Sequence, residues 1–94
     1  VEIGDVVVVL GLGLLGLYGC AIARARGARL VIGIDTVDAR VDLARHYGAH
    51  EVLQIGGMSR EDVTAQVRTW ADARGADVVI EVCGNPAAVA GIEP

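Results

Sequence analysis

The sequence predicts an α/β fold built on a doubly wound parallel sheet. Short apolar runs that suit buried strands alternate with segments of helical pattern, and short turns link them. Apolar residues make up 53% of the chain and aromatic residues only 3%, so Val, Leu, Ile and Ala must fill the core. Valine-rich runs favour parallel strands that are buried on both faces. The 94 residues suffice for one small domain.

The expected elements follow this alternation along the chain. Strands are expected at residues 5–10, 30–34, 51–55 and 77–82. Helices are expected at residues 14–26 and 38–47, between a Ser59 cap and Gly75, and from Asn85-Pro86 onwards. The third helix carries Val63, Val67 and Trp70 on one face, which we expect to be buried. Right-handed crossovers then give the strand order 3-2-1-4, with helices on both faces of the sheet.

Charge and composition exclude several classes of function. The formal net charge is −4, and no basic cluster is evident beyond Arg24 and Arg26, so nothing indicates binding to nucleic acid. The apolar run 6–16 is too short and too rich in glycine for a membrane helix, and no signal peptide is recognisable. Two cysteines, Cys20 and Cys83, make no disulfide framework. We therefore expect a cytoplasmic protein that does not act on membranes.

Three glycines with the spacing G-x-G-x-x-G follow the first expected strand and open the first helix. Gly11 permits the tight exit from the strand, Gly13 lets a pyrophosphate approach the backbone, and Gly16 lets the helix pack closely on the strand. The free N–H groups near Leu14 and Leu15 would receive the phosphates. A glycine-rich turn that serves packing alone is the alternative. The strand before the turn and the helix after it favour dinucleotide binding.

Asp35 ends the second expected strand, nineteen residues after Gly16. Its carboxylate can accept hydrogen bonds from both hydroxyls of an adenosine ribose. A 2′-phosphate at about 4 Å would cost about 4 kcal/mol per unit pair of like charges at an effective dielectric of 20, which predicts NAD rather than NADP. Arg40 can reach back to the same ribose. A capping or turn aspartate and a solvated arginine are the alternative interpretations.

The other reactive side chains receive structural interpretations. Cys20 lies in an alanine-rich helix and is expected in the core, whereas Cys83 ends the fourth strand and is expected in a pocket wall. His46 is expected on a solvated helix face and His50 in a turn. Glu81 lies in an apolar strand, where its carboxylate needs a cap or a hydrogen-bonded partner. No residue of this chain is predicted to be catalytic or to bind a metal.

Three stretches together resemble a known family. They are GDVVVVLGLGLLGLYGCAIARARGA, VIGIDTVDARVDLARHYGA and RGADVVIEVCGNPAAV, and they cover nearly the whole chain. The chain resembles the Rossmann-type cofactor-binding domain of medium-chain, zinc-type alcohol dehydrogenases and their polyol and threonine dehydrogenase relatives. The resemblance implies an NAD-dependent oxidoreductase that moves a hydride between an alcohol and NAD.

The resemblance also implies roles for individual residues. Gly11, Gly13 and Gly16, with the amides of Leu14 and Leu15, would hold the pyrophosphate. Asp35 and Arg40 would hold the ribose. Thr36 and Cys83 would flank the adenine, and the residues from Val82 to Gly84 would border the adenosine pocket.

The resemblance has limits that matter for activity. The family's zinc ligands and its last two strands have no counterpart in residues 1–94, so we expect a C-terminally truncated dinucleotide-binding domain that is inactive alone. The full-length protein would then add a catalytic zinc domain, form a homo-oligomer and bind a small alcohol. A non-catalytic NAD-sensing module, of the kind found in channel-regulatory domains or redox-sensing repressors, is the alternative. A related fold without a ligand is the third possibility.

Overall fold

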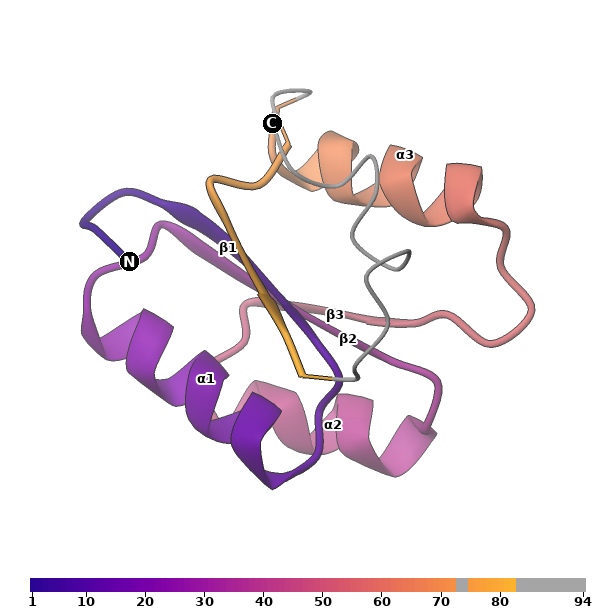
Figure 1. Cartoon of the computed structure of the whole chain (residues 1–94), viewed down its shortest axis with the longest axis horizontal. Coiled ribbons are helices and arrows are strands. Elements are labelled where there is room, and N and C mark those ends of the chain that lie inside the picture. Colours follow the sequence, from indigo (N-terminus) through magenta and orange to yellow (C-terminus); the bar gives the residue numbers. More distant parts are fainter. Residues whose placement is uncertain (73–74, 83–94) are drawn as a thin grey trace.

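A computed structural model describes residues 1–72 and 75–82 of the chain. In this part the strands are β1 (Val6–Leu10), β2 (Leu30–Asp35), β3 (Glu51–Gln54) and β4 (Val78–Glu81). The helices are α1 (Leu14–Ala25), α2 (Asp38–His46) and α3 (Arg60–Trp70) (Figure 1). All three strand pairs are parallel, and the order β3-β2-β1-β4 confirms the prediction. The helix expected from Asn85 lies outside the described residues.

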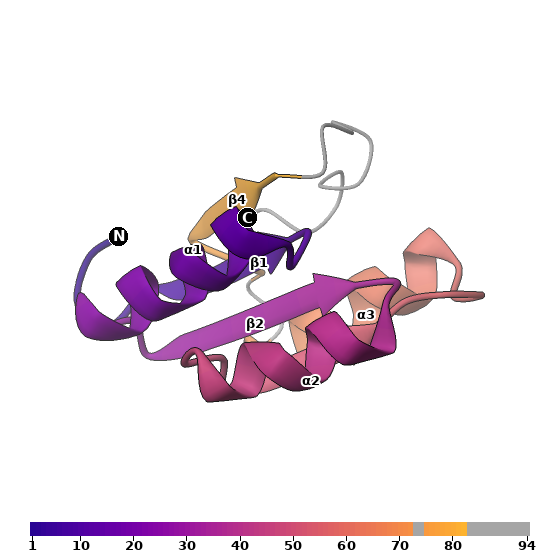
Figure 2. The ribbon, with the colours of Figure 1, turned by 90° about the horizontal axis from the view of Figure 1, so that it is seen from below.

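The sheet separates two apolar clusters, as the doubly wound fold requires. On one face Leu17 and Cys20 of α1 and Ala44 of α2 pack with inward-facing residues of β1 and β2. On the other face Val63 and Val67 of α3 pack with the alternate residues of the same strands. Figures 1 and 2 show α1 and α2 on one side of the sheet and α3 on the other. Helices therefore cover both faces, as expected.

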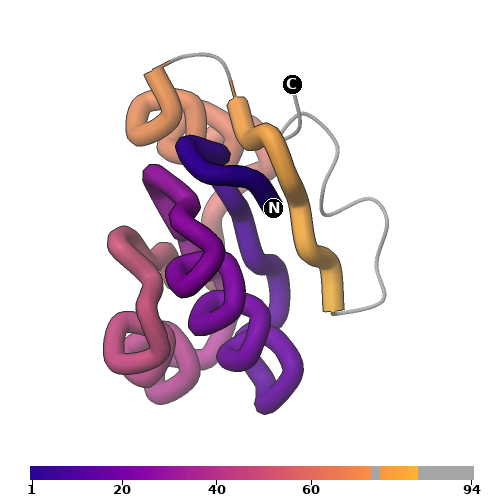
Figure 3. Tube along the Cα trace, turned by 90° about the vertical axis from the view of Figure 1, so that its left-hand side faces the viewer, coloured from indigo at the N-terminus to yellow at the C-terminus, as the bar shows by residue number. Residues whose placement is uncertain are grey.

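β1 is the strand on which both layers depend. All five of its residues are buried. Val7 and Val9 face one cluster, whereas Val6, Val8 and Leu10 face the other. The valine run is thus the double-sided strand that the sequence predicted. β4 lies beside β1 at the edge of the described sheet, and its four residues are only half-buried (Figure 3).

The ends of the helices largely follow the sequence signals, with one correction. Gly27 follows α1 with a positive φ of 91°, and the Ser59 Oγ accepts a hydrogen bond from the Asp62 N–H at 3.1 Å. α3, however, ends at Trp70 rather than near Gly75. Buried Ala71 caps the helix, and Asp72 turns the chain with φ 58°, because aspartate tolerates this conformation better than most residues.

Two further expectations about side chains are refined. Trp70 is half-buried against the core rather than enclosed within it. His50 does more than occupy a turn, because it binds Val31 at two points ahead of β3. Its backbone N–H donates to the Val31 carbonyl at 2.8 Å, and its Nδ1 accepts from the Val31 N–H at 2.9 Å. The imidazole therefore completes the pairing at the start of β2.

α1 lies unusually close to the exit from β1. A Cβ built on Gly16 would collide with the carbonyl oxygen of Gly11. The carbonyl oxygen belongs to the backbone, and the backbone of residue 16 fixes the position of its Cβ, so no side-chain rotation can relieve the collision. Gly11 itself has a φ of 91°, which most other residues avoid. The fold itself therefore requires glycine at both of these positions.

We predict that Gly16→Ala destabilises the protein. A helical Gly-to-Ala change ordinarily gains about 0.5–1 kcal/mol, whereas overpacking costs about 1–3 kcal/mol. The atom that the added methyl group meets belongs to the backbone and cannot rotate away, so we expect a net loss of about 2 kcal/mol. Urea denaturation measures the difference. An unchanged midpoint would show that α1 moves away from β1 without cost.

We also predict that acid weakens the fold through His50. Burial first, and the positive charge of Arg24 second, lower the pKa of His50 below the ordinary 6.5, although Glu51 opposes them. The unfolded chain then binds more protons than the folded one, so stability falls as the pH drops below 6.5. Denaturation midpoints at pH 7.5 and pH 5.5 measure this loss.

Matched variants isolate the imidazole. His50→Asn keeps an acceptor for the Val31 N–H but does not titrate, so it should lose part of the acid sensitivity between these two pH values. His46→Asn places the same change at an exposed helix position and should behave as the wild type. Equal acid sensitivity in all three proteins would remove the proposed role of His50.

Candidate functional site

A pocket of about 470 Å³ lies at the carboxyl edge of the sheet. The four strands are parallel, so their carboxyl ends meet at this edge. The pocket collects nine residues that the sequence singled out: Gly11, Gly13, Leu14, Leu15, Gly16, Asp35, Thr36, Arg40 and Val82. The expected Cys83 and Gly84 lie outside the described residues. In the part of the chain that the structure describes, the residues predicted separately from the sequence thus line one cavity.

The start of α1 presents unpaired backbone donors to this cavity. Gly13 is the N-cap and provides no side-chain hydrogen bond, and the first turn contains no acidic residue. The first helical bond runs from the Leu17 N–H to the Gly13 carbonyl at 3.0 Å. The preceding N–H groups, including those of Leu14 and Leu15, have no intrahelical acceptor. Together with the helix dipole they favour an anion at this point.

The fold itself does not require glycine at position 13. Its φ is −68°, which any residue can adopt, and a Cβ built on it would meet nothing within 4 Å. Neither conformation nor packing therefore calls for glycine here, in contrast with Gly11 and Gly16. The missing side chain leaves open space at the start of α1, inside the pocket. This is the opening that a pyrophosphate lying against the backbone requires.

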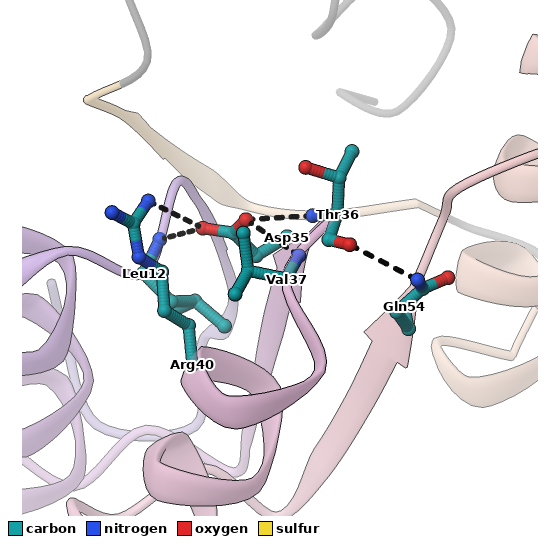
Figure 4. Close-up of polar contacts among 6 residues, drawn as sticks. All are labelled: Leu12, Asp35, Thr36, Val37, Arg40 and Gln54. Atoms are coloured by element: carbon teal, nitrogen blue, oxygen red, sulfur yellow. Dashed lines mark hydrogen bonds and ion pairs between the residues drawn. The ribbon is translucent and has the colours of Figure 1, made fainter.

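Asp35 is the one buried charged residue in the described part of the chain. Its Oδ2 accepts a hydrogen bond from the Leu12 N–H at 2.7 Å, and its Oδ1 accepts from the Thr36 and Val37 N–H groups at 2.6 and 3.0 Å (Figure 4). The turn-aspartate interpretation is therefore correct in part. A carboxylate offers about four acceptor positions, so these three bonds leave capacity for a ligand.

The same bonds keep Asp35 ionised. Burial alone raises the pKa of this carboxyl, but the N–H groups of Leu12, Val37 and Thr36 and the charge of Arg40 together lower it below 3.8. The group is thus an anion and a hydrogen-bond acceptor throughout the neutral range. Such a group can accept hydrogen bonds from ribose hydroxyls and repels a second anion.

Arg40 lies beside Asp35 in the first turn of α2. Its guanidinium nitrogen is 3.8 Å from Oδ2 of Asp35, while 55% of its side chain remains exposed (Figure 4). An ion pair with this much exposure contributes little to stability, generally about 1 kcal/mol or less. The guanidinium keeps donors available for a ligand, because it carries five N–H groups. Its placement fits the reach toward the ribose that the sequence predicted.

Leu12 anchors the glycine turn, although the sequence did not single it out. Its side chain is fully buried, and its N–H binds Asp35. A Cβ on Gly33 would lie 3.3 Å from both Leu12 methyl groups, so this glycine makes room for the leucine. A glycine inside the otherwise apolar run LVIGID was the signal that a neighbouring chain segment approaches there.

Three other residues of the pocket were also missed. Leu10, Ile34 and Ile55 line it, and each lies within one residue of the carboxyl end of a strand. Ile55 extends the sheet, because its N–H donates to the Asp35 carbonyl at 3.0 Å. Strand order alone places these positions at one edge, and so could have identified them.

Cys20 lies away from the pocket, in the apolar cluster that α1 covers. Cys20 is fully buried, and burial raises the pKa of its thiol to about 11, as expected for a core residue rather than a nucleophile. Among the described residues no three His, Cys, Asp or Glu side chains gather as metal ligands do. In that same part of the chain no helix has the length and apolar character to cross a bilayer.

Comparisons with known proteins agree with this geometry. The family model described as zinc-binding dehydrogenase matches residues 15–91. D-guloside 3-dehydrogenase of Escherichia coli (strain K12) is 42% identical over 84 residues, which are 89% of this chain and 23% of that protein. L-threonine 3-dehydrogenase of Bacillus licheniformis is 38% identical over 86 residues, 92% of this chain and 24% of that protein.

A solved structure shows the same likeness in three dimensions. An alcohol dehydrogenase from Thermotoga maritima superimposes with a TM-score of 0.85 and 37% identity over 93% of this chain, which is 24% of that chain. The present chain thus spans about a quarter of the length of these relatives. Nothing in these comparisons favours the regulatory-module alternative.

We predict that Gly13→Ala impairs binding without impairing folding. Alanine is a poorer N-cap than glycine, but it restricts the unfolded chain, so the free energy of unfolding should change by less than about 1 kcal/mol. The new methyl group would occupy the opening at the start of α1. The affinity for ADP, measured by calorimetry, should fall at least about tenfold, or 1.4 kcal/mol. Undiminished ADP binding would show that the pyrophosphate does not lie against Gly13.

Proposed function

Because the chain belongs to the zinc-binding dehydrogenase family, we propose that it forms the NAD-binding part of a medium-chain alcohol or polyol dehydrogenase. The single observation that carries the proposal is the open position of Gly13 beside the ionised, buried Asp35 in one pocket. The first accommodates a pyrophosphate, and the second accepts hydrogen bonds from a ribose. A dinucleotide contains both groups, since its pyrophosphate is bonded directly to the adenosine ribose.

Each pocket residue has a task in this proposal. The N–H groups of Leu14 and Leu15 bind phosphate oxygens, with Gly11 and Gly16 fixing the approach of strand and helix. Asp35 and Arg40 bind the adenosine ribose, while Thr36 and Val82 border the adenosine. Cys83 and Gly84 keep the roles that the family resemblance gives them.

The reaction proposed for the full-length protein is hydride transfer from an alcohol carbon. The bound nicotinamide supplies the hydride acceptor, and this chain contributes its binding and orientation. Zinc does not fit the described residues, because they offer no cluster of ligands. A zinc ion, a homo-oligomer, an alcohol substrate and a cytoplasmic location belong to the proposal for the full-length protein.

We predict that the wild-type protein binds ADP-ribose at least about tenfold more tightly than its 2′-phosphorylated form, because Asp35 repels the added phosphate. Calorimetry with the two ligands measures the preference. Equal affinities, or the reverse order, would overturn the assignment of NAD.

Two variants test whether Asp35 sets this preference. Asp35→Asn retains an acceptor oxygen but loses the charge, so it should bind ADP-ribose more weakly and narrow the preference to about threefold or less. Asp42→Asn makes the same change at an exposed position of α2 and should keep the wild-type preference. An unchanged preference in the Asp35 variant would remove its role.

A further inference from the structure

Gln54, the last residue of β3, connects two loops at the edge of the pocket. Its Nε2 donates a hydrogen bond to the Thr36 carbonyl at 3.0 Å, a bond that Figure 4 shows. Its Oε1 accepts from the Gly56 N–H at 2.9 Å. The side-chain amide therefore ties the loop after β2 to the loop after β3. Gln54 does not itself line the pocket.

The first of these bonds completes the fixation of Thr36. The Thr36 N–H already donates to Oδ1 of Asp35 at 2.6 Å. With the carbonyl held by Gln54, both polar groups of this residue's backbone have partners. Thr36 lines the pocket, so the wall that it forms is held from two sides. Of the two partners of Thr36, only Asp35 is one of the binding groups described above, whereas Gln54 is not.

The second bond fixes the neighbouring part of the pocket wall, at the start of the loop after β3. A Cβ on Gly56 would lie 3.1 Å from Nε2 and 3.3 Å from Oε1 of Gln54, so the amide sits closely against this glycine. Ile55, which lies between the two residues, lines the pocket. Gln54 therefore adds a side-chain constraint, beyond the pairing of β2 with β3, on how Thr36 and Ile55 are placed relative to one another.

The proposed binding mode places one part of the ligand against this part of the pocket wall. With phosphates at the start of α1 and the ribose at Asp35, the base lies against Thr36, as the family resemblance implies, near the ends of β2 and β3. Thr36 and Ile55 are the pocket residues at the ends of those strands. We propose that Gln54 is a positioning residue for the base of the bound nucleotide, acting through Thr36 and Ile55. This inference rests on the function proposed above.

The test compares a ligand that has the base with one that lacks it. AMP and ribose 5-phosphate share the sugar and the phosphate, and NMR titration measures both affinities. Gln54→Met keeps the length of the side chain and removes both hydrogen bonds. We expect it to weaken AMP binding about fivefold and to leave ribose 5-phosphate within twofold of the wild type.

Two more variants sharpen the test. Gln54→Glu retains the acceptor for the Gly56 N–H and loses the donor to Thr36. Its charge acts on both ligands alike, so the ratio of the two affinities should fall as it does in Gln54→Met. Gln66→Met, a half-buried position on α3 away from the pocket, should leave the ratio unchanged. Thermal denaturation without ligand confirms that each variant is folded.

The possible outcomes separate this inference from the proposed function. Equal weakening of AMP and ribose 5-phosphate would show that Gln54 supports the fold and not the base, and would overturn the inference. An unchanged AMP affinity would overturn it as well, while leaving the proposed function intact. A wild-type protein that bound neither AMP nor ADP-ribose would remove both.

Discussion

The hydrogen bond from the Leu12 N–H to the buried carboxylate of Asp35 is the constraint on which the pocket depends. It joins the glycine turn after β1 to the end of β2, two segments that are far apart in the sequence. The other oxygen of the same carboxylate holds the turn into α2. One ionised group thus sets the geometry of both loops before any ligand arrives, and a buried charge so well bonded resists replacement.

Much of this arrangement follows from local patterns in the sequence. The valine run of β1, the alternation of strands and helices and the glycine spacing predict the strand order and the layers correctly. A parallel sheet then brings the carboxyl ends of its strands to one edge, so residues such as Asp35 and Val82 meet although the sequence separates them. The strongest predictions are those that need only periodicity and handedness.

The remaining features depend on how segments approach one another in space. No periodicity indicates that Leu12 fills the gap above Gly33, that Gln54 bridges two loops or that His50 pairs with Val31. The end of α3 is another example, since the helix stops at Trp70 and the chain turns at Asp72, ahead of the Gly75 that the sequence indicated. Such contacts come from side chains whose partners are chosen by tertiary packing, which a pattern along the chain does not encode.

The three glycines of the turn differ in whether the fold itself requires them. Gly11 and Gly16 are required by backbone conformation and by helix contact, so a domain of this architecture needs them whether or not it has a ligand. Neither backbone conformation nor packing requires glycine at position 13, because its φ is ordinary and a Cβ there would meet nothing within 4 Å. A side chain at the middle glycine would therefore leave the architecture of the turn intact while it closed the space in which the pyrophosphate is proposed to lie.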